Sequence, residues 1–203
     1  SRLVRTHGGA VLRNNQAADL PAFALRKELH LSEKKRIGRA AAALVRDGDA
    51  IALDASTTAW QVARQLKDRH ELTVVTNGLF TALEFVDSPG VTVVMPGGTL
   101  RAASASLVGD EGACILERYH VQKGFFSAGG FTLEEGLTDT SQYEVELKQR
   151  MVERSKAVIA LVDSSKWGQV TFASLASVDQ LDQVITDGAA PPEMVDSLRQ
   201  LGI

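Results

Sequence analysis

Short apolar runs alternate with helical segments along most of this chain, and this rhythm constrains the fold more than any other feature. The runs at 50–53, 72–75 and 91–94 consist of Ala, Val, Ile, Leu and Thr. Strands that lack an apolar–polar alternation are buried on both faces. Helices are predicted between them over 58–66 and 79–86. The pattern therefore predicts an α/β domain with a mostly parallel sheet flanked by helices.

The second half of the chain continues this pattern less regularly. The elements predicted there are strands at 121–127, 157–162 and 182–186 and helices at 109–118, 141–154 and 191–201. The broken rhythm predicts a small second-half subdomain beside the main sheet.

Two serines are predicted to cap helices. Ser32 precedes an apolar stripe at helical spacing that runs to Val45. Ser141 opens the helix at 141–154, and Glu144 follows three residues later, which is the spacing of a capping box.

The first 31 residues differ from the rest. Residues 1–10 are basic and interrupted by glycines, and residues 14–19 are polar without a sustained period. We therefore expect residues 1–31 to be a connector or arm that follows a missing N-terminal domain, and residues 32–203 to be the main domain.

Composition excludes several classes of protein. The net charge of −3 gives this region no electrostatic reason to bind nucleic acid. The single cysteine, Cys114, excludes an internal disulfide and is predicted to be a buried structural thiol in a reducing compartment. The four histidines lack metal-ligand spacing, no apolar run reaches the roughly 20 residues of a membrane span, and no signal peptide opens the chain. We expect a cytoplasmic protein without a metal or cofactor.

Ligands of parallel α/β sheets bind beyond the carboxyl ends of the strands, so the residues there are the candidates for a site. Asp54, Ser56, Thr57 and Thr58 follow the first strand and lead into a helix. Hydroxyl groups and free N–H groups at a helix start suit a phosphate, although an ordinary helix cap would have the same sequence. Asp54 would repel phosphate, so it is expected beside ligand hydroxyls or as a carboxylate that fixes the loop.

The second and third strands end in small and polar residues. Thr76 and Asn77 follow the second strand, and an Asn amide suits a sugar hydroxyl or caps the next helix. Gly97 and Gly98 follow the third strand and permit close backbone approach to a ligand, or a tight turn. Arg101 lies nearby in the sequence and is a candidate for the same binding site.

The later strands add cations. Ser127 and Gly129 follow the strand at 121–127 and expose backbone groups. Lys166 follows the strand at 157–162 and is a candidate cation for an anionic ligand, or a surface lysine in an ion pair. Lys148 is a further candidate, and it lies four residues after Glu144, so a solvated ion pair is the alternative. The convergence of such groups at five strand ends is the evidence for a binding site.

The order of these motifs resembles the C-terminal sensor domain of the DeoR family of bacterial transcriptional regulators. The matching segments are LDASTT at 53–58, VVTN at 74–77, PGG at 96–98, SLVG at 106–109, FSAGG at 126–130 with GLT at 136–138, and DSSKWG at 163–168. RTHGGA at 5–10 is similar to the segment that follows the family's winged helix-turn-helix domain. One departure is Ala55, where the family more often has glycine.

The resemblance implies a fold similar to ribose-5-phosphate isomerase and glucosamine-6-phosphate deaminase. It also implies a homo-oligomeric repressor of sugar metabolism that senses a phosphorylated sugar and contacts operator DNA only through its missing N-terminal domain. The phosphate would lie at residues 56–58, and Asn77, Gly97, Gly98 and Lys166 would line the rest.

Two alternatives remain. The first is a sugar-phosphate isomerase or deaminase, but the related isomerases carry acidic residues in the loop that matches residues 127–130, and this loop has none. Glu134, Glu135 and Asp139 lie downstream in a different motif context. We therefore expect a binding domain with no catalytic residue. The second alternative is an oligomerisation domain without a ligand, which the polar strand ends disfavour.

Overall fold

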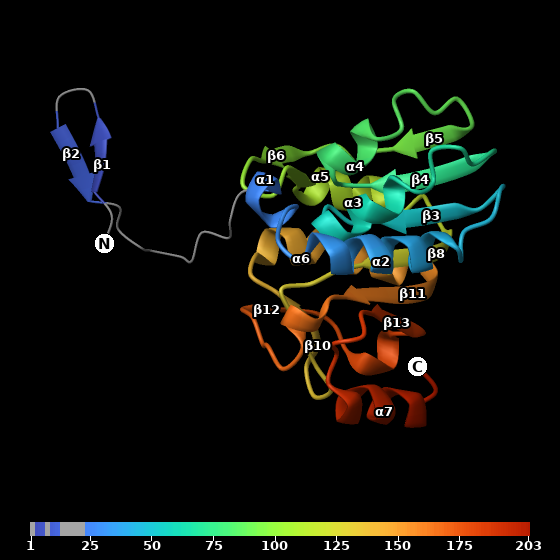
Figure 1. The fold of residues 1–203 in the computed structure, drawn as a ribbon. Coiled ribbons are helices and arrows are strands. Elements are labelled where there is room, and N and C mark those ends of the chain that lie inside the picture. The colour runs from blue at the N-terminus through green and yellow to red at the C-terminus, as the bar shows by residue number, and fades with distance from the viewer. Residues whose placement is uncertain (1–2, 7–8, 13–22) are drawn as a thin grey trace.

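A six-stranded parallel sheet forms the centre of the molecule (Figure 1). The structure, a computed structural model, describes the backbone of residues 3–6 and 9–12 and all of residues 23–203. In spatial order the strands are β13 (Gln183–Thr186), β11 (Ser155–Val162), β8 (Val121–Phe126), β3 (Ala50–Leu53), β4 (Leu72–Thr76) and β5 (Val91–Val94). The predicted α/β fold with a parallel sheet is confirmed, and all six strands predicted from the apolar runs belong to this sheet.

Helices cover both faces of the sheet. The helices are α1 (Phe23–Arg26), α2 (Leu31–Ala42), α3 (Thr57–Ala63), α4 (Leu79–Leu83), α5 (Asp110–Leu116), α6 (Gln142–Glu153) and α7 (Pro192–Gln200). On one face α2 and α3 pack together, and the side chains of Ile51, Leu53 and Ile159 point into the core beneath them. Alternate residues of the same strands therefore serve opposite faces, which explains why no strand alternates with polar residues.

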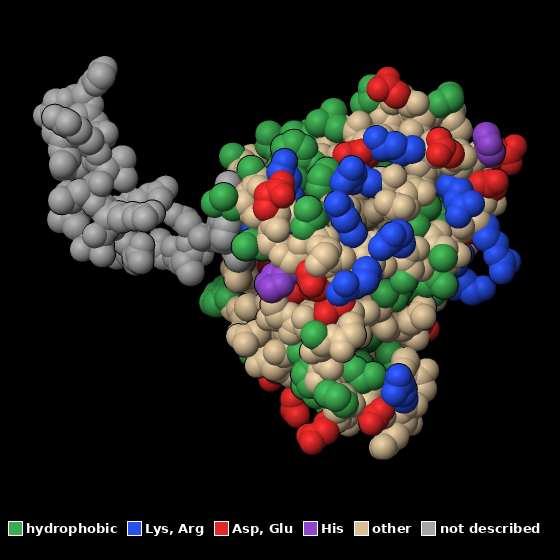
Figure 2. All heavy atoms as spheres, viewed as in Figure 1, with side chains coloured by type: hydrophobic (Ala, Val, Ile, Leu, Met, Phe, Trp, Pro, Cys, Tyr) green, Lys and Arg blue, Asp and Glu red, His purple; other side chains and the backbone are tan. Residues whose placement is uncertain are grey.

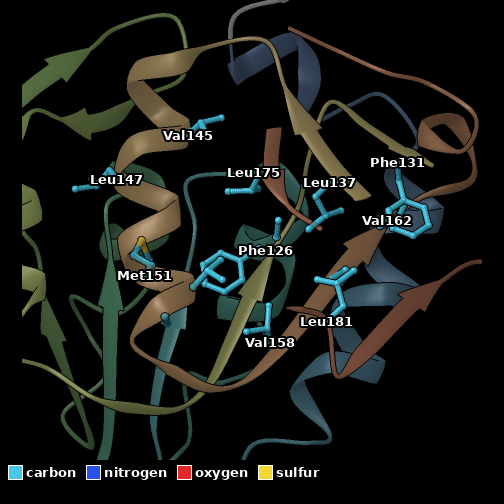
Figure 3. Packing of buried hydrophobic residues seen from close by; sticks show 14 of the residues in the cluster. Phe126, Phe131, Leu137, Val145, Leu147, Met151, Val158, Val162, Leu175 and Leu181 are labelled. Atoms are coloured by element: carbon cyan, nitrogen blue, oxygen red, sulfur yellow. The ribbon is translucent and has the colours of Figure 1, made fainter. Parts of the chain in front are cut away.

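The second core lies between the sheet and α6. Phe126 of β8 and Met151 of α6 are both buried there, and Figure 3 shows them facing each other. Val158 and Val162 of β11 belong to the same cluster. This core fixes α6 against the strands, so any side chain that α6 directs toward the strand ends has a defined position.

Small antiparallel sheets complete the fold. They are formed by β9 (Gly130–Thr132), β10 (Gly136–Asp139) and β12 (Ala173–Ala176), by β6 (Thr99–Arg101) with β7 (Ser106–Val108), and by β1 (Leu3–Thr6) with β2 (Gly9–Leu12). Two short 3₁₀ helices lie at Ser164–Lys166 and Val178–Gln180. The sheet of β9, β10 and β12 is the small second-half subdomain that the broken rhythm predicted.

Several local predictions require correction. Ser32 does not cap α2: His30 occupies the cap in a left-handed conformation, φ 52°, and the Ser32 hydroxyl donates to Glu33. Ser141 does precede α6, but its side chain makes no capping hydrogen bond. Cys114 is exposed on α5 and is not a buried thiol.

Helix α1, which falls within residues 1–31, packs against the main domain. Phe23 of α1 is buried, and its ring stacks on Phe80 with centroids 4.4 Å apart. The remainder of the predicted connector falls partly on residues 1–2, 7–8 and 13–22, which lie outside the described residues. In the described part of the chain, every helix is too short or too polar to cross a lipid bilayer.

Candidate functional site

A small hollow opens where β3 and β8 end side by side. From β3 the chain moves outward through β4 to β5, whereas β8, β11 and β13 follow in the opposite direction, so the crossover direction switches between β3 and β8. Such a switch point is the preferred ligand site of open parallel sheets. The hollow has a volume of about 50 Å³ and is lined by Arg26, Ala55, Ser56, Ser127, Ala128, Gly129, Asp139, Glu144, Lys148 and Lys166.

Lys148 forms the floor of this hollow. Its Nζ lies 2.7 Å from Asp139 Oδ2, 3.1 Å from Asp54 Oδ2 and 3.0 Å from the carbonyl oxygen of Ser127. An ammonium group has three N–H donors, so these three acceptors use its full capacity. The structure does not support the alternative of a solvated pair with Glu144, because the Lys148 side chain is buried and paired with two carboxylates from distant segments.

The electrostatics keep Lys148 charged. Burial lowers the pKa of Lys148, but the charges of Asp139 and Asp54 outweigh it and raise that pKa above its ordinary value. Burial raises the pKa of Asp139, yet the adjacent Lys148 holds it below the ordinary value. A protonated lysine has no lone pair with which to accept a proton, so Lys148 itself is not suited to be a general base.

Asp54 joins the ends of the two central strands. Its Oδ1 accepts a hydrogen bond from the Ser56 amide and its Oδ2 accepts one from the Ser127 amide, both at 3.0 Å. Asp54 is completely buried. Of the two roles considered for Asp54, the structure supports the carboxylate that fixes the loop.

Only one of the three hydroxyl residues after β3 lines the hollow. Ser56 does so, and its Oγ also accepts a hydrogen bond from the Ala59 amide as the cap of α3. Thr57 and Thr58 are buried, with 6% and 2% of their surface exposed. Because α3 is enclosed by α2 and α4, its first turn leaves these two side chains little free surface.

The groups after β4 support a hairpin instead of the hollow. Thr76 is the buried last residue of β4, and its Oγ1 accepts from the Gly78 amide. The buried Asn77 side chain donates to the Leu107 carbonyl at 3.2 Å, and the Leu107 amide donates back to the Asn77 carbonyl at 2.8 Å. These contacts position the hairpin of β6 and β7.

The glycines after β5 form a tight turn into the same hairpin. Gly97 and Gly98 have φ values of 77° and 104°, which favour glycine, and a Cβ at Gly98 would collide with the Val108 carbonyl. Arg101 on β6 lies 3.2 Å from Glu144 Oε1. Arg101 thus neutralises a carboxylate that lines the hollow. The two glycines only form the turn that leads into the hairpin on which Arg101 lies.

Two cations at the hollow remain free of ion pairs. Neither Arg26 nor Lys166 forms an ion pair with a carboxylate within residues 23–203, and both are half-buried. The pKa of the neighbouring Lys34 is lowered to about 8, mainly by burial; the charge of Asp163 opposes this lowering, and the charges of Lys166 and Arg26 add to it.

Sequence reasoning assigned Lys166, Lys148, Ser127 and Gly129 to the site, and the hollow includes them all. It assigned Arg26 to the connector, and no motif distinguished this residue. Glu144 was considered only as a cap and as a partner for Lys148.

A larger cavity lies between α5 and α6. It has a volume of about 270 Å³ and is lined by Gly109, Asp110, Ala113, Tyr143, Glu146, Leu147, Gln149, Arg150 and Glu153. Its single arginine, Arg150, lies 3.0 Å from Glu153. With an excess of carboxylates and its cation paired, this cavity is less suited to an anion than the hollow at the strand ends. Within residues 23–203, no group of His, Cys, Asp and Glu side chains forms a metal site.

Structural neighbours share the fold at low sequence identity. A ribose-5-phosphate isomerase solved with phospho-erythronic acid matches with a TM-score of 0.50 and 13% identity over 66% of this chain and 52% of the isomerase. The eIF2B delta subunit of Chaetomium thermophilum matches with a TM-score of 0.55 and 16% identity over 80% of this chain and 58% of that subunit. The predicted similarity to the isomerase fold is confirmed.

Sequence relatives define the family. The HTH-type regulator YulB of Bacillus subtilis is 41% identical over 97% of this chain and 76% of its own length. GolR of Listeria innocua, another HTH-type regulator, is 38% identical over 98% of this chain and 78% of its own length. These relatives are transcriptional regulators and not enzymes. The family model described as the DeoR C-terminal sensor domain matches residues 29–188. The chain therefore belongs to the DeoR family of transcriptional regulators and contains its C-terminal sensor domain.

Proposed function

We propose that this domain senses a phosphorylated sugar or a related phosphorylated metabolite and thereby regulates, as a repressor, an operon of sugar metabolism. The phosphate binds in the hollow, between Arg26 and Lys166, which both line it. The observation that carries this proposal is the presence of these two half-buried cations, which form no ion pair among residues 23–203, at the switch point of the sheet. Charge-assisted hydrogen bonds to phosphate are among the strong polar contacts in proteins.

The size of the hollow supports a position for the phosphate group. About 50 Å³ accommodates little more than one phosphate group, because a single water occupies roughly 30 Å³ in the liquid. The phosphate therefore fills the hollow, and the sugar lies at its mouth. There Glu144, the backbone of Gly129 and the hydroxyl of Ser56 are available to bind sugar hydroxyls.

Names of related proteins support this ligand class. One relative is the GlcR repressor of Bacillus subtilis, at 33% identity, and another is the glycerol-3-phosphate regulon repressor of Escherichia coli, at 28% identity. The isomerase of similar fold was solved with a phosphorylated sugar acid.

Regulation requires a DNA-binding part. We propose that residues 32–203 form the sensor domain, extended by α1, and that residues before it connect to a winged helix-turn-helix domain that contacts operator DNA in a homo-oligomer. Effector binding shifts the population between two arrangements of the subunits. A coupling on the order of 1–3 kcal/mol changes operator affinity about 5- to 150-fold.

A thermal-shift screen of sugar phosphates tests the ligand. A ligand at a hundred times its Kd stabilises the domain by about 2.7 kcal/mol, which raises the Tm of a chain of this size by roughly 5–10 °C. The matched control is the same sugar without its phosphate, which should raise the Tm far less. Stabilisation by no phosphorylated compound would contradict the proposal.

Two further assays address regulation and catalysis. An isomerase and deaminase assay on each stabilising compound should show no turnover, and turnover would support the enzyme alternative. In a gel shift with the intact regulator, the same compound should change operator affinity.

A further inference from the structure

The helix α1 brings the first residues of the main domain into the hollow. Arg26, the last residue of α1, lines the hollow together with Lys166, although the two belong to opposite ends of the chain. Figure 1 shows α1 beside the start of α2, where the chain enters the domain from its N-terminal side. An anion held by Arg26 is therefore in contact with the segment that leads toward the N-terminus.

An aromatic contact anchors the start of α1. The Phe23 ring stacks on Phe80 of α4 at an interplanar angle of 22° and meets the edge of Trp60 of α3 at 5.9 Å. Phe23 is 5% exposed. None of these three rings lines the hollow, so the anchor and the hollow are separate contacts of one short helix.

A buried lysine holds the other end. Lys34 of α2 donates from Nζ to the carbonyl oxygens of Arg26 and Leu29, each at 2.7 Å. Burial is the main cause of the lowered pKa of Lys34, and the charges of Lys166 and Arg26 also lower it. An anion beside Arg26 and Lys166 offsets their repulsion of the Lys34 ammonium group and so strengthens its attachment to the end of α1.

Elsewhere α1 is weakly held. Leu25 and Leu29 are 63% and 52% exposed. A helix of four residues has no independent stability, so its position depends on the contacts at its two ends. Segments with few buried contacts open locally at low free-energy cost. Figure 2 shows hydrophobic side chains gathered at the surface in this part of the molecule.

From these contacts we infer that α1 is the element through which this domain reports occupancy of the hollow: a bound phosphate group fastens α1 against α2 and α4, and an empty hollow leaves it free to detach. The inference rests on the proposed function, because it requires an anion in the hollow. By linkage, whatever detaches α1 also weakens anion binding by the same factor.

Hydrogen exchange on the 203-residue chain tests whether a bound anion fastens α1. Inorganic phosphate is the probe, and chloride at equal ionic strength is the blank. Phosphate should slow exchange of the amides of residues 24–30 by roughly fivefold or more. The amide of Leu201 on the far side of the molecule, which is bonded to Ser197, should keep its exchange rate.

The variant Phe23→Ala tests the reciprocal effect of α1 on anion binding, since it loosens α1 without touching the hollow. It should weaken phosphate binding by roughly fivefold in calorimetry. The matched control is Leu198→Ala, which removes an equally buried side chain from α7 and should leave the affinity unchanged. If Phe23→Ala does not fold, the milder variant Phe23→Leu and the exchange data on the wild-type chain test the same coupling between α1 and anion binding.

The outcomes separate the two claims. If phosphate binds and Lys166→Ala abolishes the binding, but residues 24–30 exchange at an unchanged rate and Phe23→Ala binds normally, the inference about α1 is overturned and the proposed function stands. If neither phosphate nor any sugar phosphate binds, both are overturned.

Discussion

Two groups of cations at the same edge of the sheet have opposite surroundings. Lys148 is buried, and two carboxylates and a carbonyl saturate it. Arg26 and Lys166 lie a short way outward, half-buried and without an ion pair among residues 23–203. A lysine whose donors are all used holds strands together, whereas a cation with unused donors is available to a ligand. Burial and pairing, and not residue type, distinguish scaffold from binding group here.

The largest effect is expected from removing the buried cation. Lys148→Met leaves Asp54 and Asp139 as uncompensated buried charges, which should lower the free energy of unfolding by about 3–5 kcal/mol. Urea denaturation measures this change. Lys156→Met on β11 removes an exposed lysine and should change stability by less than about 0.5 kcal/mol. Equal effects of the two substitutions would show that the cluster is not a structural centre.

Acid should weaken the same cluster. Because the pKa of Asp139 is lowered in the folded chain, its contribution to stability is present above its ordinary pKa of about 3.9 and is lost as the pH falls through the lowered value. The variant Asp139→Asn should therefore lose less stability than the wild type below about pH 4. The difference is about 1.4 kcal/mol for each unit by which the pKa of Asp139 is lowered. Asp179→Asn, an exposed position, is the control. Parallel acid curves for wild type and Asp139→Asn would contradict the pairing.

Removing Lys166 from the lining of the hollow should affect ligand binding and not folding. Lys166→Ala should weaken phosphorylated sugars about 10- to 100-fold, the usual loss for a hydrogen bond to a charged group. Its Tm without ligand should stay near that of the wild type, and free sugars should bind as before. Equal losses for phosphorylated and free sugars in calorimetry would show that Lys166 does not contact the phosphate.

The smallest effects distinguish the hydroxyl groups. Ser56→Ala should weaken the phosphorylated ligand about 2- to 10-fold, because Ser56 lines the hollow. Thr57→Val keeps the shape of a buried side chain and should leave the affinity unchanged. A greater loss for Thr57→Val would restore the phosphate position that the family resemblance implies.

Much of the fold could be predicted because it depends on local pattern. The six parallel strands are apolar runs, and their ends meet at one edge by topology alone. A small second-half subdomain was predicted, but its individual strands β9 and β10 were not, since they are three or four residues long and contain glycine. Their pairing depends on contacts made by the rest of the domain.

The site was predictable only where chain order sufficed. Ser127 and Lys166 follow strands and lie at the hollow for that reason. Lys148 was a candidate for the site, but its partners Asp54 and Asp139 could not be predicted, because no helical period reveals those separations and the spacing from Glu144 offered a surface pair as the alternative. Arg26 lies in a segment without periodicity, and only the tertiary contacts of α1 show its place.

A crystal structure of the chain with the sugar phosphate that raises the Tm most would test the central claim directly. Phosphate oxygens should lie at about 2.7–2.9 Å from the side-chain nitrogens of Arg26 and Lys166, with the Lys148 pairs intact. A phosphate seated between α5 and α6, or anywhere away from these two cations, would contradict it.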